Sequence, residues 1–441
     1  MTESNPPVAN GASHGASPPP KRNPAFRMLG IPNFTFKLPS RNWLIFLSVT
    51  GSFASLILYD KYEKKKSQKK WCTLVSHLAR EPLDSRVMPR KVTVFLAAPP
   101  GDGLRVPREH FIEYIKPILV AAAMDWDVIE GRREGDLRAG LAERIRKLRK
   151  RSEHPNPAEE EEEDVVRTIR ERGGIRDWDG TMGDIVVGRH TWKEYIRGLH
   201  EGWLGPLKPP EVDSIRPSDA TQDPFDPDAQ SLLEGSASPE ASPAGSEPEK
   251  PTQETKKPSE SAAIPAFIPT SAYPQSNLPQ SLPQSFDPVT PFPLQHVLGF
   301  LNTPTRIYRF LNRRHLAENA GRETAAVVLA MQTRPYHSST SSSNDPDFAT
   351  NFREDPSPGV VVWEQEAVLE HEESDWHKSV RKARANDTER TWLDDVVMDP
   401  RIAERMLRFE LSSEDDARAG RISQGLEIAR DAGQKGDNDS A

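Results

Sequence analysis

The segment 43–59, which reads WLIFLSVTGSFASLILY, constrains the fold of this chain more than any other stretch. It contains no ionisable side chain, and Arg41 and Asp60 flank it. A helix rises about 1.5 Å per residue and the bilayer core is about 30 Å thick, so this run is just long enough to cross. Trp43 and Tyr59 at its ends suit the headgroup region. A buried core helix or a signal peptide is the alternative, but secretory signals do not normally follow a polar segment such as residues 1–42. We predict one transmembrane helix.

Small residues occupy one face of this predicted helix. They recur at helical spacing and are Ser48, Gly51, Ser52 and Ser55. Small side chains let two membrane helices approach each other closely. We therefore expect these four residues to pack against another membrane helix.

The composition excludes several classes of protein. Of 441 residues, 41 are prolines and only 35% are hydrophobic, so less of the chain folds than its length suggests. Cys72 is the only cysteine, which excludes an internal disulfide, and no Cys/His cluster has zinc spacing. A net charge of −8 gives no case for nucleic-acid binding. We predict no metal and no cofactor.

Both flanks of the apolar run are basic. Residues 1–42 form a disordered basic N-terminal segment, and residues 60–89 form a basic juxtamembrane stem that begins with Lys61. Because the two flanks carry the same sign, the positive-inside rule does not settle the orientation. The lysines of the stem are either solvated or in contact with anionic lipid headgroups.

Strands and amphipathic helices alternate over residues 90–204. Short β-rich runs at 91–97, 126–129 and 185–187 are each followed by a helical pattern, at 111–122, 137–148 and 191–203. This alternation predicts an α/β domain with a mostly parallel sheet covered by helices on both faces. The basic face at 144–151 is interpreted as solvated, or as a contact for cardiolipin or a partner protein.

The second half of the chain is interrupted. Residues 205–293 are Pro-rich and polar, and we expect a disordered insertion there, or else a linker between two domains. The α/β domain then continues over 294–336, with a strand at 297–301, a helix at 305–317 and an apolar helix or strand at 324–331. Residues 337–410 contain a strand at 360–363 and helices at 376–385 and 400–409, the last beginning at the N-cap Asp399. A disordered tail follows at 411–441.

Three local sequences carry a family resemblance. They are NPAFRMLGIP at 23–32, LYDKYEKK at 58–65 and RKVTVFLAAPPGDGL at 90–104. Their order resembles the fungal fifty-four-kilodalton subunit of the mitochondrial inner-membrane carrier translocase, over most of 20–205 and 295–410. The resemblance implies a single-pass scaffold with its N-terminus in the matrix and its bulk in the intermembrane space. The implied partners are channel-forming and small chaperone subunits and inner-membrane lipids. The family has no established catalytic motif, so no enzymatic activity is expected.

A second resemblance concerns the α/β domain. The strand–loop–helix order that ends in TWKEYIRGL at 191–199 is similar to the nucleotide-binding lobe of diacylglycerol and acylglycerol kinases. The two glycine-rich loops of those enzymes would fall here on Gly188, Arg189, His190 and Thr191, and on Pro304, Thr305 and Arg306. Glycines let backbone N–H groups approach phosphates, and bulky side chains replace most of them here. We interpret both loops as degenerate, which favours a scaffold. A divergent lipid kinase, or a membrane-tethered adaptor of another organelle, is the alternative.

Overall fold

The computed structural model describes residues 40–153, 162–208, 265–340, 361–376 and 390–427. The chain divides into two compact units, Met1–Leu58 and Tyr59–Ala441, which are treated separately below. The predicted disordered segments at 1–39 and 209–264 lie outside the described residues, as does most of the helix expected at 376–385.

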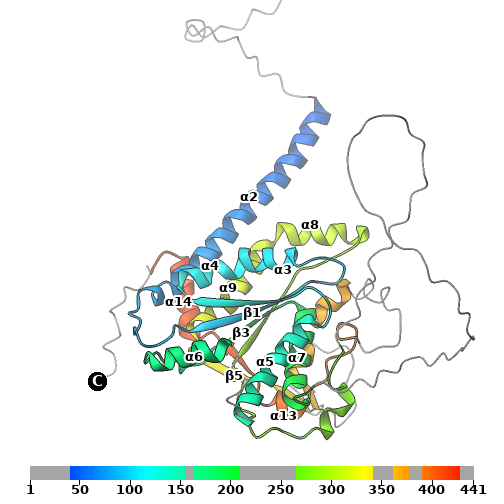
Figure 1. The fold of residues 1–441 in the computed structure, drawn as a ribbon. Coiled ribbons are helices and arrows are strands. Elements are labelled where there is room, and N and C mark those ends of the chain that lie inside the picture. Colours follow the sequence, from blue (N-terminus) through cyan, green and yellow to red (C-terminus); the bar gives the residue numbers. More distant parts are fainter. Residues whose placement is uncertain (1–39, 154–161, 209–264, 341–360, 377–389, 428–441) are drawn as a thin grey trace, which may run out of the picture. The chain divides into compact units, whose positions relative to one another are not determined.

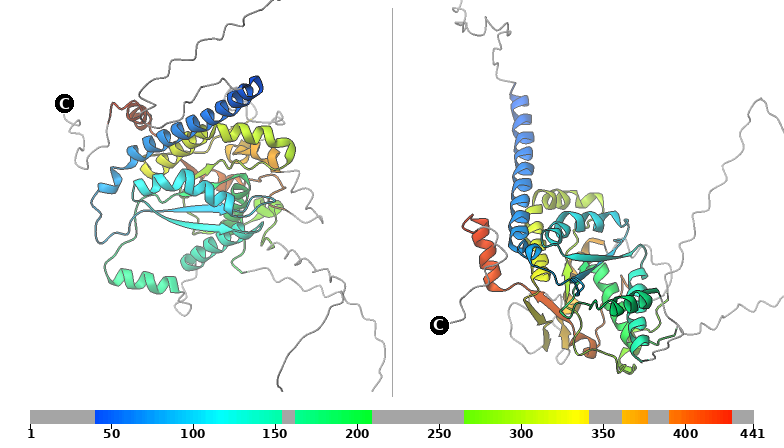
Figure 2. Two further views of the ribbon diagram at one scale, coloured as in Figure 1. Left: turned by 90° about the horizontal axis from the view of Figure 1, so that it is seen from above. Right: turned by 60° about the vertical axis from the view of Figure 1, so that its left-hand side comes forward.

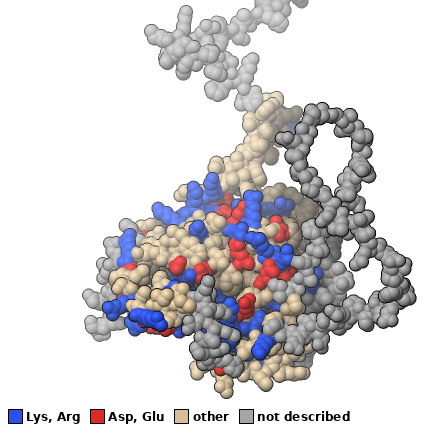
Figure 3. Space-filling view, in the orientation of Figure 1, with Lys and Arg blue, Asp and Glu red and all other residues tan. Residues whose placement is uncertain are grey.

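The described part of the first unit is the beginning of helix α2 (Arg41–Val75). Within the described residues, α2 is the one helix that is long and apolar enough to cross a membrane, as the sequence predicted. Its apolar part carries almost no charged side chains and is drawn in tan in Figure 3. Ser48, Gly51, Ser52 and Ser55 are exposed on one face of the helix, and a Cβ added at Gly51 would meet no atom within 4 Å. Their role in packing remains a prediction.

A parallel sheet forms the centre of the second unit. Its strand order is β2-β1-β3-β4, with β1 (Lys91–Ala97) and β3 (Asp184–Val187) inside and β2 (Asp125–Gly131) and β4 (Val289–Phe292) at the edges. All three strand pairs are parallel; Val94 of β1, for example, is paired with Val128 of β2 and Ile185 of β3. The predicted α/β class with a mostly parallel sheet is confirmed.

Helices cover both faces of this sheet (Figure 1). Side chains alternate across a strand, and along β1 Val92, Val94 and Leu96 enter one buried cluster whereas Phe95 and Ala97 enter the other. The first cluster also contains side chains of α4 (Lys116–Ala121) and α9 (Arg313–Leu329). The second contains side chains of α5 (Asp136–Glu153) and α7 (Arg189–Leu204). Two hydrophobic layers therefore fix the sheet, as in other doubly covered parallel sheets.

Shorter elements complete the second unit. The helices are α3 (Arg105–His110), α6 (Glu162–Arg172), α8 (Thr303–Leu311), α11 (Glu364–Ala367), α13 (Pro400–Ala403) and α14 (Ser413–Ser423). The 3-10 helices are η1 (Leu78–Arg80), η3 (Thr270–Gln275), η4 (Phe300–Asn302) and η5 (Glu370–Glu372), and the π-helix η2 (Phe111–Ile115) lies between α3 and α4. Two antiparallel pairs join β5 (Gln332–Pro335) to β8 (Leu407–Glu410) and β6 (Ser338–Thr340) to β7 (Val361–Trp363). Figure 2 shows these parts around the sheet.

The residues after the apolar run form a stem with two faces, one exposed and basic and the other packed on the domain. They continue α2 as far as Val75, and Trp71, Leu74 and Val75 are fully buried in the first cluster. Glu318 of α9 accepts hydrogen bonds from Ser67 Oγ at 2.5 Å and from Lys70, and Lys64 pairs with Glu113. The lysine pattern suggested a solvated stem because one face of this helix is charged, but its other face is part of the core.

The sheet resumes earlier than predicted. The stretch 205–293 was expected to be disordered, yet η3 and β4 both lie inside it, whereas 297–301 is not a strand. Pro291 could not donate a ladder hydrogen bond inside a sheet, because proline has no N–H. β4 is an edge strand, where proline is tolerated, and Val289 and Phe292 beside Pro291 are buried.

Two C-terminal expectations were also wrong. The helix that begins at Asp399 ends at Ala403, and the following residues form β8, which pairs with β5. Sequence pattern alone does not separate a short apolar helix from a strand whose partner is distant. The tail is helical over α14, where Ser412 Oγ accepts a hydrogen bond from the Asp415 N–H and caps the helix.

Gly321 of α9 permits the close packing of α2 on the domain, and substituting it tests this contact. A Cβ added there would stand 2.2 Å from Cδ1 of Trp71. We expect Gly321→Ala to destabilise the domain by about 1–3 kcal/mol through overpacking, despite a gain of up to about 1 kcal/mol in helix propensity. Thermal unfolding of the full-length chain in detergent, followed by tryptophan fluorescence, measures the effect.

Gly140→Ala in α5 is the matched control, because a Cβ at Gly140 would meet nothing within 4 Å. This control variant should be as stable as the natural chain or more so. If Gly321→Ala raised the unfolding midpoint as Gly140→Ala does, Trp71 would not pack against α9 as described.

Candidate functional site

Two helix N-termini meet the carboxyl edge of the sheet. β2 leads into α5 and β3 leads into α7. In open parallel sheets ligands bind at this edge, and the free N–H groups at a helix N-terminus attract anions such as phosphate. The start of α7 is also where Gly188, Arg189, His190 and Thr191 lie, so the first degenerate kinase loop falls at this edge.

The turn into α7 requires a glycine. Gly188 has φ of 90°, and a Cβ added there would stand 3.0 Å from His190 Cε1 and 3.1 Å from Leu294 Cβ. All four positions, Gly188 to Thr191, are buried. The backbone of a strand–glycine–helix turn is therefore present, but its surroundings are filled by protein.

A carboxyl group of the chain itself occupies the position where an anion would bind. Glu372 Oε2 accepts a hydrogen bond from the Arg189 N–H at 2.8 Å, and Glu372 Oε1 accepts one from the Leu294 N–H at 2.7 Å. Burial raises the pKa of Glu372 to about 8, and these two N–H groups and the Arg189 charge oppose the rise. Glu372 binds where a phosphate oxygen would bind in a nucleotide site.

Arg189 ties the segment around Glu372 to the start of α7. Its Nε donates to Glu373 Oε1 at 2.7 Å, and one terminal nitrogen donates to the carbonyl oxygens of Glu366 and Val368 at 2.7 and 2.6 Å. The side chain is almost fully buried. Arg189 therefore holds residues 366–373 against the start of α7.

Lys193 and His190 extend the same contact. Lys193 Nζ lies 2.9 Å from Glu373 Oε1 and donates to the Asp394 carbonyl at 2.8 Å, and burial lowers its pKa. His190 Nε2 lies 2.9 Å from the Ala97 carbonyl oxygen, and burial lowers the pKa of its ring to about 4, so the ring is neutral at pH 7. Neither side chain faces an open cleft.

The N-terminus of α5 is filled in the same way. Glu194 Oε2 accepts hydrogen bonds from the Leu137 and Arg138 N–H groups at 3.1 and 3.3 Å. Its Oε1 accepts from Trp392 Nε1 at 2.7 Å. Burial raises the pKa of Glu194 to about 7. An internal glutamate thus occupies each helix N-terminus at this edge.

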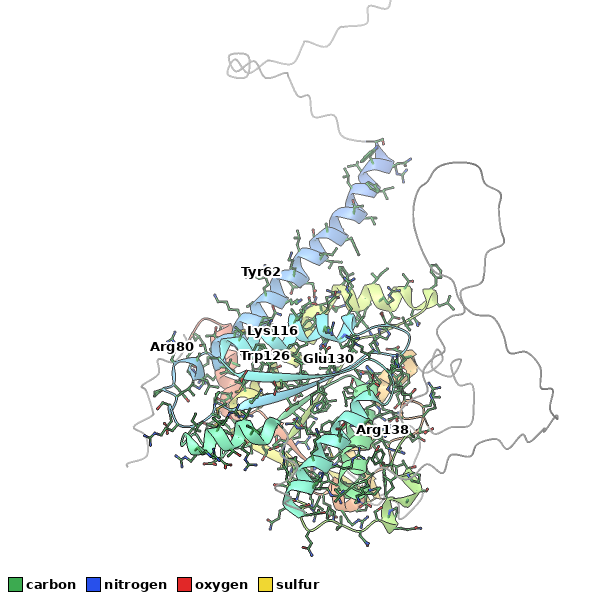
Figure 4. The ribbon with its side chains drawn as sticks, viewed as in Figure 1. Tyr62, Arg80, Lys116, Trp126, Glu130 and Arg138 are labelled. Carbon is green, nitrogen blue, oxygen red and sulfur yellow. The ribbon has the colours of Figure 1, made fainter. Side chains whose placement is uncertain are left out.

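The basic face at 144–151 is solvated only in part, because Arg144 and Lys150 are exposed whereas Arg146 and Arg149 are buried. Arg138, at the start of α5 (Figure 4), and Arg146 both contact the buried carboxylate of Glu201, and Arg149 donates to the carbonyls of Gly202 and Gly205. These arginines face α7 because it supplies the acid and the carbonyl groups. The prediction of a solvated face was wrong for the buried arginines because their partners are distant in sequence.

The second degenerate loop lies on a different kind of surface. Pro304, Thr305 and Arg306 are exposed on the first turn of α8, whereas Gly188 to Thr191 are buried. The structure does not bring the two predicted loops together as the walls of one open site. A hollow of about 490 Å³ lies between η3 and α13, lined by Tyr273, Met398 and Asp399 among others.

Sequence patterns did not identify the residues that fill the carboxyl edge of the sheet. Glu372 and Glu373 lie in an acidic stretch that is typical of a solvated surface, and Glu194 lies in an aromatic helix. The sequence signal at this place was the pair of bulky side chains, Arg189 and His190, where the kinase resemblance would put glycine-rich loop positions. Within the described residues, no group of three His, Cys, Asp or Glu side chains is placed to hold a metal ion.

Comparison with known proteins agrees with the family resemblance. The family model described as "Inner membrane protein import complex subunit Tim54" matches residues 23–409. The chain belongs to the Tim54 family. It is 52% identical to the mitochondrial import inner membrane translocase subunit tim54 of Aspergillus oryzae, over 90% of each chain. Its identity to the Neurospora crassa subunit is 44%, over 91% of this chain and 83% of the relative. The Saccharomyces cerevisiae subunit is 26% identical, over 88% and 94%.

Titration of Glu372 gives a test of the filled site. The folded chain holds the Glu372 proton up to about pH 8, but the unfolded chain releases it near the ordinary value of 4.5. The folded state binds more protons between these values, so this group's contribution to stability falls as pH rises through the window. We expect Glu372→Gln to remove a slope of at most about 1.4 kcal/mol per pH unit, measured by urea unfolding of the full-length chain from pH 5 to 8.

The substitution also costs stability at every pH, because the amide nitrogen of glutamine cannot accept from a backbone N–H. The measurement that tests the prediction is therefore the pH dependence of the unfolding free energy, not its value at a single pH. Glu404→Gln is the control. Because Glu404 is exposed, this substitution should change neither the unfolding free energy nor its pH dependence. An unchanged slope in Glu372→Gln would show that Glu372 is ionised throughout.

Proposed function

We propose that this chain is a non-enzymatic subunit of the mitochondrial inner-membrane translocase that inserts polytopic carrier proteins. It acts as a membrane-anchored scaffold and as a docking platform in the intermembrane space. Membership of the Tim54 family and the candidate span in α2 support this proposal. The observation that carries the non-enzymatic part is the Glu372 carboxylate at the start of α7.

The filled edge argues against phosphoryl transfer. A kinase needs backbone N–H groups free to hold phosphates, and the Arg189 and Leu294 N–H groups are bonded to Glu372. Opening the site would break several buried charge-assisted hydrogen bonds that Arg189 donates. The segment that would have to leave is part of the folded domain.

The proposed partners are the channel-forming and small chaperone subunits of the translocase, and inner-membrane lipids such as cardiolipin. We propose that the N-terminus lies in the matrix and residues 60–441 in the intermembrane space. Ser48, Gly51, Ser52 and Ser55 are the proposed contact with a membrane helix of a partner. The degenerate positions, from Gly188 to Thr191 and from Pro304 to Arg306, have no catalytic role in this proposal.

Substitution of Thr191 tests whether the chain acts as a scaffold or as a kinase. Its Oγ1 is buried at the start of α7 and has no hydrogen-bond partner in the described residues. Removing an unsatisfied buried hydroxyl is neutral or stabilising, so Thr191→Val should raise stability by up to about 1 kcal/mol. Cells in which this variant replaces the natural chain should insert carriers normally, as measured by import of a carrier precursor and native electrophoresis of the complex.

A kinase would behave differently, because the corresponding threonine borders its phosphate loop. Thr290→Val in β4 is the control, since its Oγ1 is also buried without a partner but lies in the edge strand. Loss of carrier insertion in Thr191→Val alone, together with stabilisation of the natural chain by ATP, would favour the enzyme. ATP at a hundred times its dissociation constant would stabilise by about 2.7 kcal/mol.

Protease protection tests the proposed orientation. In isolated mitochondria, protease should digest the chain after Tyr59 only when the outer membrane is ruptured, and a tag at residue 1 should stay protected. Digestion of the tag with protection of the body would reverse the orientation. Digestion before rupture would place the protein in another compartment.

A further inference from the structure

The segment η4–α8 carries an exposed apolar face that neither the sequence pattern nor the proposed function explains. We call it the α8 face. Phe300 and Leu301 are 88% and 91% exposed, Tyr308 is 69% exposed, and Ile307 and Phe310 are also exposed. No residue of α8 is buried. Five large apolar side chains within eleven residues form a patch, not the scattered exposure that is normal for soluble proteins.

The polarity of α8 is opposite to that of a helix on a water-facing surface. Such a helix directs its apolar stripe to the core and its charges to water. Here Arg309 is directed to the domain, where it pairs with Asp375 at 2.9 Å, while Ile307, Tyr308 and Phe310 remain exposed. Something other than water therefore covers the outer side of α8.

The end of α8 lies close to the point where the chain leaves the apolar run. Arg314 of α9 bonds Asp60 through its backbone N–H at 3.1 Å, and its guanidinium lies 5.5 Å from the ring centre of Tyr59. Tyr59 is the last residue of the apolar run. Phe310 is four residues before Arg314, so their Cα atoms are at most about 14 Å apart. The α8 face is therefore within reach of a bilayer interface.

Charge around the face matches an anionic surface. Arg306 is exposed on α8 and Arg313 follows the helix, and the exposed side chains of α2 just after Tyr59 include Lys61, Lys65, Lys66 and Lys69. Basic residues near a bilayer are attracted by anionic headgroups. Apolar side chains beside basic ones on a single helix are typical of helices that lie in a membrane interface.

We propose that η4–α8 lies in the headgroup region of the membrane that this chain itself crosses, with Phe300, Leu301, Ile307, Tyr308 and Phe310 entering the outer part of the acyl layer. The occupant of the α8 face is lipid, with a preference for anionic headgroups. The contact holds the edge of the domain near Asp60 against the bilayer. It depends on α2 crossing a membrane, and it depends neither on the orientation of the chain nor on the translocase role.

Depth-dependent fluorescence quenching tests this contact. Cys72 is the only cysteine, so a Cys72→Ser background allows one environment-sensitive fluorophore to be placed on Tyr308→Cys. The full-length chain is reconstituted in phosphatidylcholine vesicles, alone or mixed with cardiolipin. Lipids carrying a nitroxide either near the headgroup or at the end of the acyl chain act as quenchers. Leu148→Cys on α5 is the matched control, because it is an exposed apolar residue on the opposite face of the sheet.

We expect a blue-shifted emission at position 308, loss of fluorescence with the shallow nitroxide, and a larger loss when cardiolipin is present. The fluorophore at position 148 should show the emission of a label exposed to water. A water-like emission at 308 in vesicles would overturn the proposal, as would equal quenching at 308 and 148. Shielding at 308 only in the native mitochondrial complex would identify a protein as the occupant and also overturn it. Thermal unfolding confirms that both labelled chains are folded.

Discussion

The hydrogen bond from the Arg189 N–H to the Glu372 carboxylate joins two parts of the chain that are 183 residues apart. On one side lies the carboxyl edge of the parallel sheet, and on the other lies the segment from Glu364 to Trp376. Because Glu372 also accepts from the Leu294 N–H after β4, one side chain fixes the start of α7, the exit of the edge strand and the C-terminal region. The remaining contacts of Arg189 and Lys193 depend on that placement.

A carboxylate supplied by the same chain has an advantage over any free anion. Its effective concentration at the helix N-terminus is set by the fold, whereas a phosphate must bind from solution. The rise in the Glu372 pKa shows what burial costs, and the surrounding N–H groups and arginine offset part of that cost. Glu194 repeats the arrangement at α5. Backbone N–H groups at the starts of two neighbouring helices are therefore bonded to side chains of the same chain.

Sequence patterns predicted the features that depend on residues close together in the chain. The apolar run, the order of strands and helices around β1 to β3, and the N-cap at Asp399 all appear in the structure. What could not be predicted depends on distant partners. Pro291 belongs to a strand because β4 lies at an edge, Arg138 and Arg146 are buried because Glu201 faces them, and Glu372 is internal because a glycine turn lies opposite. Among the site residues, the sequence singled out Gly188 to Thr191 at the start of α7, but it did not predict that Glu372 and Glu194 would bond the two helix N-termini.

The end of the apolar run and the beginning of the folded body are adjacent in the chain. Tyr59 ends the run, and Asp60 is already buried against Arg314. A flexible linker would allow the body to diffuse within the volume that its length permits. No such linker exists between Tyr59 and Asp60, so residues near Arg314 must stay within a few residues' reach of the bilayer. In the proposed arrangement, the outward apolar side chains of α8 lie in that zone. Exposing these side chains to water costs a soluble domain free energy, whereas burying them in lipid stabilises a domain held at a membrane surface.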